Sequence, residues 1–379
     1  MVTVIALLVT VLAIGCFLVP RLYTDPKRKA QEDQKKLASQ EREELIAEIN
    51  QKNQAALASW EQEKERILHP PEQAPVTPVW PQQKMEGWDI LDLTDYPLEN
   101  ASVEQKYRSE LMNNGMLLIN EWHSRPADFS EAELKSVGKY LGGNEKVQVD
   151  NYNITLFPIA SDALLEAVNA ARAAGMEHYI VTEGYRSWDT QNQMFTKQKE
   201  KLASKYSSEE DLINATKRDV NYPGTSEFNS GLAFTLKLYA KGNNEINGAK
   251  YSTTEQARWM NENCWKYGLI FRFPQAGWPL PDTQDKSQKT GVSAKLNLYR
   301  YVGKGNAAFM HYLDMCLEEY IEYLHAHPHL ALFEDGVLKY EVYCQYVGDD
   351  DTFLVQTTRS RSHVSSLDNM GYVITVFEQ

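Results

Sequence analysis

The chain has little cysteine and no excess of positive charge, and both shortages narrow the function classes open to it. Its four cysteines include no CxxC pair, so neither a zinc ribbon nor a dithiol redox motif is expected. Lys and Arg number 39 against 52 Asp and Glu, which gives a formal net charge of −13. Because binding to phosphate backbones needs clustered basic residues, we expect no nucleic-acid partner.

Long hydrophobic runs are also scarce, and the one of membrane-spanning length covers residues 2–20. About 20 apolar residues, each adding 1.5 Å, span the roughly 30 Å hydrocarbon core of a bilayer. No Lys or Arg precedes the run, which favours an uncleaved anchor over a signal peptide, and residues 1–22 are therefore assigned to a transmembrane helix. Several basic residues follow the run, and by the positive-inside rule they favour a cytoplasmic C-terminal side.

Composition divides the rest of the chain into a stalk, a linker and a folded part. Residues 23–68 are rich in good helix formers and predict a stalk helix, whereas residues 69–86 are rich in proline and predict an extended linker. A folded domain is expected at 87–330 and a small β-unit at 331–379. The stalk is either a solvated helix or a dimerising one, because its apolar residues keep an interrupted 3/4 spacing: Ile46, Ile49, Ala56, Trp60 and Ile67.

Strand and helix patterns alternate irregularly in the folded part. Short apolar runs predict strands at 115–120, 179–182 and 269–273, and helical patterns cover 162–174, 254–267 and 307–325. Residues 339–346 and 372–377 alternate as strands do. Without a regular strand–helix–strand rhythm, this order predicts an α+β fold rather than a parallel α/β fold.

Two segments after predicted strands or turns carry candidate site residues. Residues 183–195 (EGYRSWDTQNQMF) deliver Arg186, Ser187 and Gln191 from a strand onto a loop, where a guanidinium with two polar neighbours can hold a carboxylate. Residues 223–236 (PGTSEFNSGLAFTL) begin with a turn, continue through Ser226 and end in an apolar strand-like run. A structural pairing of Arg186 with Ser226, with no ligand, is the alternative.

Four blocks in this order resemble the VanY-type D-alanyl-D-alanine carboxypeptidases, zinc enzymes that trim peptidoglycan stem peptides. They are GYRS with Gln191, then PGTSEFNSGLAFTL, then WMNENCWKYGLIFRFP at 259–274, and last KTGVSAKLNLYRYVG at 289–303. The resemblance runs from about residue 117 to about residue 324 and implies an antiparallel-sheet carboxypeptidase-like domain with flanking helices. It also implies that Arg186, Gln191 and Ser226 contact the substrate peptide.

The chain departs from that family at the positions of the zinc ligands and of the general base. The family pattern S-x-H-x-x-G-x-A-x-D holds zinc through its His and Asp, and here those positions are Phe228 and Thr235. The family E-P-W-H supplies the general base and the third zinc ligand, and here the Glu and His positions are Lys295 and Leu298. Phe and Leu carry no donor atom, a threonine hydroxyl is a poor ligand, and a lysine repels a cation, so we expect neither zinc nor the zinc reaction.

No replacement ligand set stands out. The tract HAHPH places His325, His327 and His329 close together, but its position predicts a solvated helix end. Glu227 and Asn229 flank the lost ligand position and alternate away from Phe228.

The sequence therefore predicts an inactive, membrane-anchored family member that binds a stem peptide or a cell-wall protein partner through Arg186, Ser187, Gln191 and Ser226. The family acts outside the bacterial membrane, so we expect a single-pass protein with an extracytoplasmic domain despite the basic residues after the anchor. Two alternatives stay open: an active D,D- or L,D-carboxypeptidase with a displaced metal, and a scaffold whose cleft is vestigial.

Overall fold

The computed structural model describes residues 85–292 and 295–379, together with isolated positions between 29 and 58. The predicted anchor at 2–20 lies outside the described residues, as does all but the end of the predicted linker. Within the described part, no helix is both long and apolar enough to cross a bilayer. The described positions of the predicted stalk are helical. The chain divides into two compact units, Met1–Val79 and Trp80–Gln379, and the second contains all elements described below.

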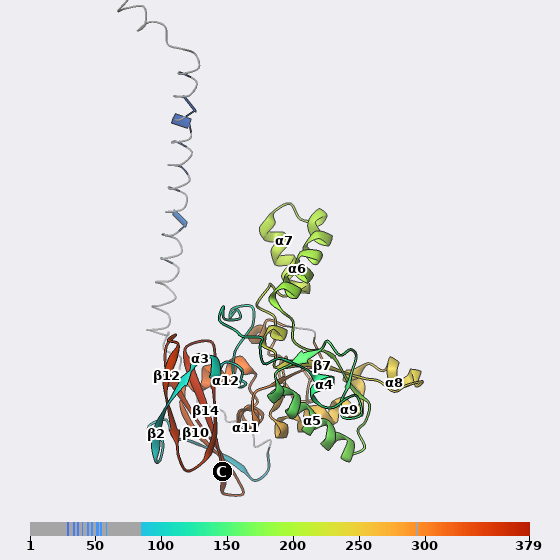
Figure 1. The fold of residues 1–379 in the computed structure, drawn as a ribbon, viewed down its shortest axis with the longest axis vertical. Helices are drawn as coiled ribbons and strands as arrows, with labels where there is room; N and C mark the ends of the chain where they lie inside the picture. The colour runs from blue at the N-terminus through green and yellow to red at the C-terminus, as the bar shows by residue number, and fades with distance from the viewer. Residues whose placement is uncertain are drawn as a thin grey trace, which may run out of the picture. The chain divides into compact units, whose positions relative to one another are not determined.

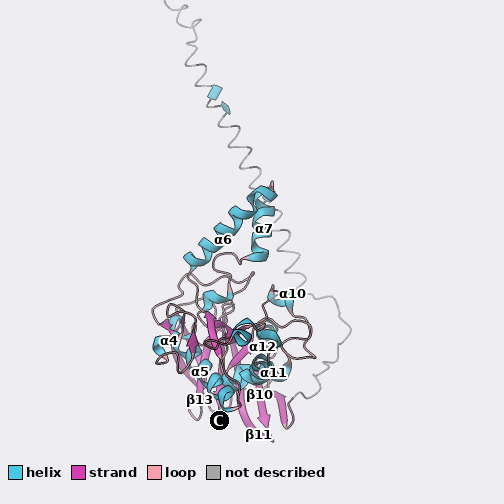
Figure 2. Cartoon of the chain, turned by 90° about the vertical axis from the view of Figure 1, so that its right-hand side faces the viewer, coloured by secondary structure: helices cyan, strands magenta, loops and turns pink. Residues whose placement is uncertain are grey.

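A five-stranded central sheet organises the middle of the chain, in the order β4 (Gln148–Val149), β6 (Tyr179–Glu183), β7 (Ala233–Leu238), β9 (Leu298–Tyr301) and β8 (Leu269–Phe271). Only β4 and β6 run parallel, and the other neighbours are antiparallel. Helix α5 (Pro158–Ala173) covers one face, and α6 (Trp188–Leu202) and α7 (Glu209–Asp219) project together from the rest of the unit (Figures 1 and 2). The α+β prediction is confirmed.

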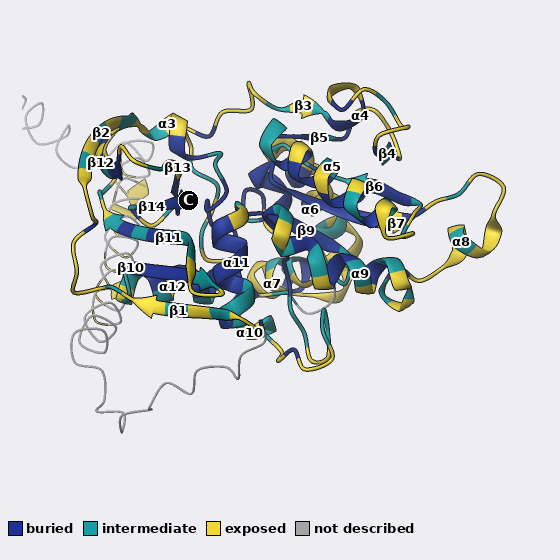
Figure 3. Ribbon diagram, turned by 90° about the horizontal axis from the view of Figure 1, so that it is seen from below, coloured by how far each residue is buried: buried dark blue, intermediate teal, exposed yellow. Residues whose placement is uncertain are grey.

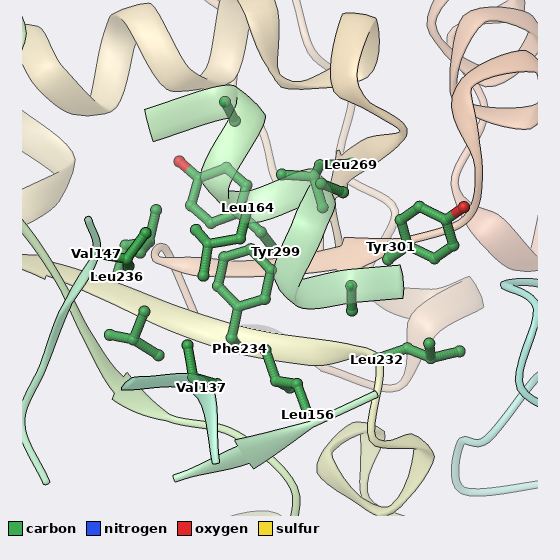
Figure 4. Close-up of a cluster of buried hydrophobic side chains, with 14 of the residues drawn as sticks. Val137, Val147, Leu156, Leu164, Leu232, Phe234, Leu236, Leu269, Tyr299 and Tyr301 are labelled. Carbon is green, nitrogen blue, oxygen red and sulfur yellow. The ribbon is translucent and has the colours of Figure 1, made fainter. Parts of the chain in front are cut away.

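Successive side chains of each strand point to opposite faces of this sheet, and one of the two faces packs into the core. Phe234 and Leu236 of β7 point toward Leu164 of α5, and Tyr299 of β9 joins them (Figure 4). The intervening residues, Thr235 and Lys237, must then lie on the opposite face, because successive strand side chains alternate. The groove described below runs over that second face.

Short elements complete the fold. They are α3 (Arg108–Leu111), β3 (Lys135–Ser136), α4 (Val137–Tyr140), β5 (Thr155–Leu156), α8 (Asn244–Gly248), α9 (Glu255–Asn263), α10 (Ser287–Thr290) and four 3-10 turns, η1 (Ala203–Lys205), η2 (Glu227–Ser230), η3 (Tyr251–Thr253) and η4 (Cys264–Tyr267).

Two predicted elements were wrong. The helix expected at 307–325 is two helices, α11 (Lys304–Leu313) and α12 (Leu317–Ala326), because Asp314 adopts a left-handed conformation that ends the first. Residues 115–120 are buried but form no strand. The carbonyls of Gly115 and Leu117 accept hydrogen bonds from the Arg300 guanidinium at 2.7 and 2.8 Å, which takes the place of a strand ladder.

Both ends of the described unit contribute to a second, C-terminal sheet. Its order is β1 (Trp88–Asp92), β10 (His329–Glu334), β11 (Val337–Tyr346), β14 (Tyr372–Glu378) and β13 (Ser362–Leu367), and beside it β2 (Ala101–Tyr107) pairs with β12 (Thr352–Thr358). Helices α11 and α12 pack against this sheet through a buried apolar cluster (Figure 3). The expected domain boundary between residues 330 and 331 falls inside β10. The C-terminal sheet also includes β1, which lies near the start of the described unit.

Candidate functional site

The turn η2 holds Phe228 in the interior. Ser226 precedes the turn, and its N–H donates to Asn229 Oδ1 at 3.1 Å, which satisfies an amide at the start of the turn. Gly231 ends the turn at φ 69°, and a Cβ there would lie 2.7 Å from the Phe157 ring, so only glycine fits. This geometry leaves the Phe228 ring 1% exposed.

Lys295 and Leu298 also lie around that ring, and Thr235 lies on the adjoining strand. Leu298 is fully buried and belongs with Phe228, Ala233 and Phe273 to a separate apolar cluster. Thr235 lies opposite Leu298 in the β7–β9 pair, and its hydroxyl is 2.9 Å from the hydroxyl of Thr182. The cavity that remains beside Phe228 and Lys295 measures about 20 Å³, little more than one water molecule occupies.

Two cations pack against the Phe228 ring. The guanidinium carbon of Arg186 lies 4.2 Å from the ring centroid, and the ammonium of Lys295 lies 4.5 Å from it. Both are within the range of a favourable cation–π contact. Burial lowers the pKa of Lys295, and the nearby Arg186 charge lowers it further, against the opposing effect of Glu183.

These residues do not fit a zinc ion. Phe228 and Leu298 offer no donor, the Thr235 hydroxyl already pairs with Thr182, and the local charge of Arg186 and Lys295 is positive. Across residues 85–292 and 295–379, no three His, Cys, Asp or Glu side chains are grouped as a metal site requires.

Most side chains of the predicted carboxylate-binding site already hydrogen-bond to other residues of this chain. Arg186 donates to Glu183 Oε1 at 2.8 Å and to Gln191 Oε1 at 3.3 Å. Gln191 is fully buried, and its amide donates to the Asn221 carbonyl at 2.8 Å. Ser187 caps α6 by accepting from the Thr190 N–H at 3.1 Å. Arg186 therefore remains at the site, whereas the side chains of Ser187 and Gln191 have structural partners.

An open groove of about 560 Å³ begins beside Lys295 and crosses the second face of the central sheet. Its lining includes Thr182, Glu183, Thr235, Lys237, Lys295 and Asn297. In the described chain, no carboxylate lies within ion-pair distance of the Lys295 ammonium, which distinguishes Lys295 from Arg186. Lys295 is thus a half-buried cation that makes no direct ion pair with the described residues, although Glu183 of the same groove acts on it at longer range.

Sequence reasoning missed a buried charge network next to the site. Arg272 Nε donates to Glu227 Oε2 at 2.6 Å, and its two terminal nitrogens hold Glu318 at 2.9 and 2.6 Å. Arg300 also pairs with Glu227. The sequence features that could have indicated this network were Arg272 in FRFP, Arg300 in RYVG and the acidic Glu227 next to Phe228. The network ties η2 to helix α12.

The histidine tract is a partly exposed helix end at His325 and His327 but not at His329, and its members do not converge. His325 lies 2.7 Å from Asp368, His327 lies 2.6 Å from Asp92, and His329 lies 2.6 Å from Glu341. Helix α12 ends at Ala326, and His329 is buried as the first residue of β10. Each histidine therefore has its own carboxylate within the C-terminal part of the fold.

Comparison with known proteins gives one family. The family model described as VanY, D-alanyl-D-alanine carboxypeptidase, matches residues 153–304. A D-alanyl-D-alanine carboxypeptidase of Enterococcus faecalis is 30% identical over 230 residues, which are 60% of this chain and 74% of the relative. One of Enterococcus faecium is 26% identical over 282 residues, 74% of this chain and 80% of the relative.

A solved structure supports the fold. A vancomycin-resistance D,D-dipeptidase, crystallised with a D-Ala-D-Ala phosphinate analogue, superposes with a TM-score of 0.54 at 19% identity, covering 74% of this chain and 99% of its own. All four blocks quoted from the sequence lie within the matched region. The chain belongs to the VanY family of D-alanyl-D-alanine carboxypeptidases.

Proposed function

We propose that this protein is a non-hydrolytic member of its family that binds the C-terminal carboxylate of a cell-wall stem peptide. The observation that carries the proposal is the half-buried Lys295 ammonium, which has no carboxylate partner in the described chain and faces a groove of about 560 Å³. A buried charge without a counter-ion is costly, and a ligand carboxylate removes that cost. A cell-wall protein with an accessible C-terminal carboxylate is the second candidate.

Loss of hydrolysis follows from the side chains at the four positions. Hydrolysis in this family requires a zinc-activated water and a general base, which need donor atoms and a carboxylate. Phe228 and Leu298 instead contact each other in an apolar cluster, and a lysine stands at the base position. Arg186 and Lys295 are well suited to binding an anion and poorly suited to binding a divalent cation.

The proposal also includes a membrane anchor and a domain outside the membrane. Residues 2–20 would anchor the protein in a bacterial membrane, and the domain would face outward, where stem peptides occur. The alternatives remain an active carboxypeptidase with a displaced metal and a scaffold that binds nothing in the groove.

Zinc content and D-alanine release separate the enzyme from the binding protein. The purified chain, loaded with zinc and dialysed, is analysed for bound metal and assayed with a stem pentapeptide ending in D-Ala-D-Ala. We expect no stoichiometric zinc and no D-alanine. Stoichiometric zinc together with turnover would overturn the proposal.

Titration calorimetry with the same pentapeptide separates the binding protein from the scaffold. Lys295→Met removes the charge but keeps a long apolar side chain, and we expect at least a tenfold loss of affinity. The control, Lys139→Met, lies on α4 and should bind as the wild type does. A pentapeptide whose C-terminal carboxylate is amidated should also lose binding. Absence of binding by the wild type would support the scaffold.

A further inference from the structure

Strand β2 forms an exposed edge with an apolar outer face. It pairs with β12 alone among the described strands, in a two-stranded sheet. On its outer face Val103 is 61% exposed and Tyr107 is 57% exposed, and Leu354 of β12 is 67% exposed on the same face. Figure 3 shows β2 and β12 at the periphery of the C-terminal part. An edge with free backbone groups is a template for pairing with another strand.

The hydrogen-bond pattern shows which residues of β2 face the free edge. The Arg108 N–H donates to the Asp351 carbonyl at 2.9 Å, directly after the last pair of the ladder, Tyr107 with Thr352. Because hydrogen-bonded and non-hydrogen-bonded pairs alternate in antiparallel sheets, Glu104 and Lys106 bond to β12. Val103 and Gln105 therefore direct their N–H and C=O groups outward. The outward N–H of Tyr107 is already held by Glu110 Oε2 at 2.8 Å.

The sequence of β2 is self-complementary about Gln105. In an antiparallel pair of two β2 strands centred there, Glu104 of each copy faces Lys106 of the other, and Val103 faces Tyr107. Opposite charges and apolar pairs directly across a sheet stabilise it. Centring the pair on Glu104 or on Lys106 would instead place like charges opposite each other. Among these three registers, charge therefore selects the one centred on Gln105.

We propose that β2 is an interface for a second copy of this chain, paired antiparallel with a two-fold axis at Gln105. The two Gln105 residues exchange two main-chain hydrogen bonds, and each Val103 N–H donates to the Tyr107 carbonyl of the other copy. Each chain already pairs Lys106 with Glu104 at 2.8 Å. In the paired strands each of these four charged side chains therefore has one neighbour of opposite charge in its own chain and one in the other copy. The result is a continuous sheet of β12, β2 and their two symmetry mates, independent of the peptide groove and of any stalk contact.

Sedimentation analysis of residues 80–379 tests this interface without the stalk. This unit contains all four buried apolar clusters, so it has its own core. We expect a concentration-dependent dimer. Gln105→Pro removes an outward N–H and leaves the β12 ladder intact, so it should give a monomer with an unchanged thermal unfolding midpoint.

Charge reversal provides a second measurement that does not depend on proline. Lys106→Glu should raise the dimer dissociation constant at least tenfold, because it places two carboxylates opposite each other. The double variant Glu104→Lys with Lys106→Glu restores opposite charges and should restore the dimer. A wild-type fragment that stays monomeric, or a dimer insensitive to these variants, would overturn the proposal. A heterologous strand on the same edge would give that monomeric result.

Discussion

The ammonium of Lys295 lies 4.5 Å from the ring centroid of Phe228. By the family resemblance, these two positions correspond to a general base and a zinc ligand, a carboxylate and an imidazole that cooperate around a metal. Here they form a cation–π contact, which is favourable without a metal and excludes one by charge. The two side chains therefore fill most of this position together, and about 20 Å³ of space remains beside them.

Reinstalling the donor set should recover metal binding. The quadruple variant Phe228→His, Thr235→Asp, Lys295→Glu and Leu298→His places two histidines and two carboxylates where the backbone register brings Thr235 and Leu298 opposite each other. We expect about one zinc per chain by elemental analysis after dialysis. Because each change replaces a side chain packed around an apolar cluster, its unfolding midpoint without zinc should fall and should recover with zinc.

The quadruple variant also tests whether these four positions correspond to the zinc ligands and the general base of the family. A well-folded quadruple variant that takes up no zinc would contradict the assignment of these four positions. The triple variant that keeps Phe228 serves as the matched control, because it lacks one imidazole and should bind zinc much more weakly.

The charge on Lys295 should make stability depend on pH in the alkaline range. Burial lowers its pKa in the folded state below the value of about 10.4 in an unfolded chain. Between those two values the unfolded state binds more protons, so the free energy of unfolding contributed by this group rises with pH. Lys295→Met should therefore be more stable than the wild type near neutral pH, and urea unfolding should show the difference shrinking as pH rises toward 10.4. A difference that is constant with pH would contradict this cause.

Removal of Arg272 should destabilise the fold far more than removal of an exposed arginine. Arg272 holds Glu227 and Glu318 in a buried network, and its loss leaves Glu318 without its ion-pair partner and Glu227 with Arg300 alone. Breaking a buried ion pair costs about 3–5 kcal/mol. The matched control is Arg258→Met, whose side chain is 67% exposed and pairs loosely with Glu255 at 3.7 Å. Denaturant unfolding of the two variants gives the comparison, and equal losses would show that the network contributes little.

His329 should make the C-terminal sheet more stable at mildly acidic pH. Burial by itself lowers the pKa of His329, but hydrogen bonds to Glu341 and to the Tyr96 carbonyl outweigh it and raise the pKa above its ordinary value. The stabilisation is therefore complete below about pH 6.5, the ordinary value of an unfolded histidine, and is lost as pH rises through the folded value. The coupling energy of a His329→Gln and Glu341→Gln double-mutant cycle should decrease over that range. A coupling that does not change with pH would mean that the imidazole stays neutral in the fold.

Much of the fold can be predicted from local sequence. Periodicity predicts β6, α5 and the alternating strands β11 and β14, because each pattern repeats within one element. The ordered blocks identify the family. Phe228 and Leu298 exclude zinc coordination at their positions by composition alone, since neither side chain has a donor atom.

Tertiary contacts decided what surrounds Phe228 and which strands join the C-terminal sheet. Arg186 lies against Phe228 and pairs with Glu183, and these contacts join η2 with β6 and the loop after it. Strands β1 and β2 join partners more than 200 residues further along the chain. Such pairings carry no periodic signal, because they depend on which surfaces the folded chain brings together. The sequence by itself determined that Phe228 and Leu298, which the resemblance places at two zinc-ligand positions, carry no donor atom. Only the tertiary structure decided that Arg186 and Lys295 pack against Phe228, because contacts between distant segments form only in the folded chain.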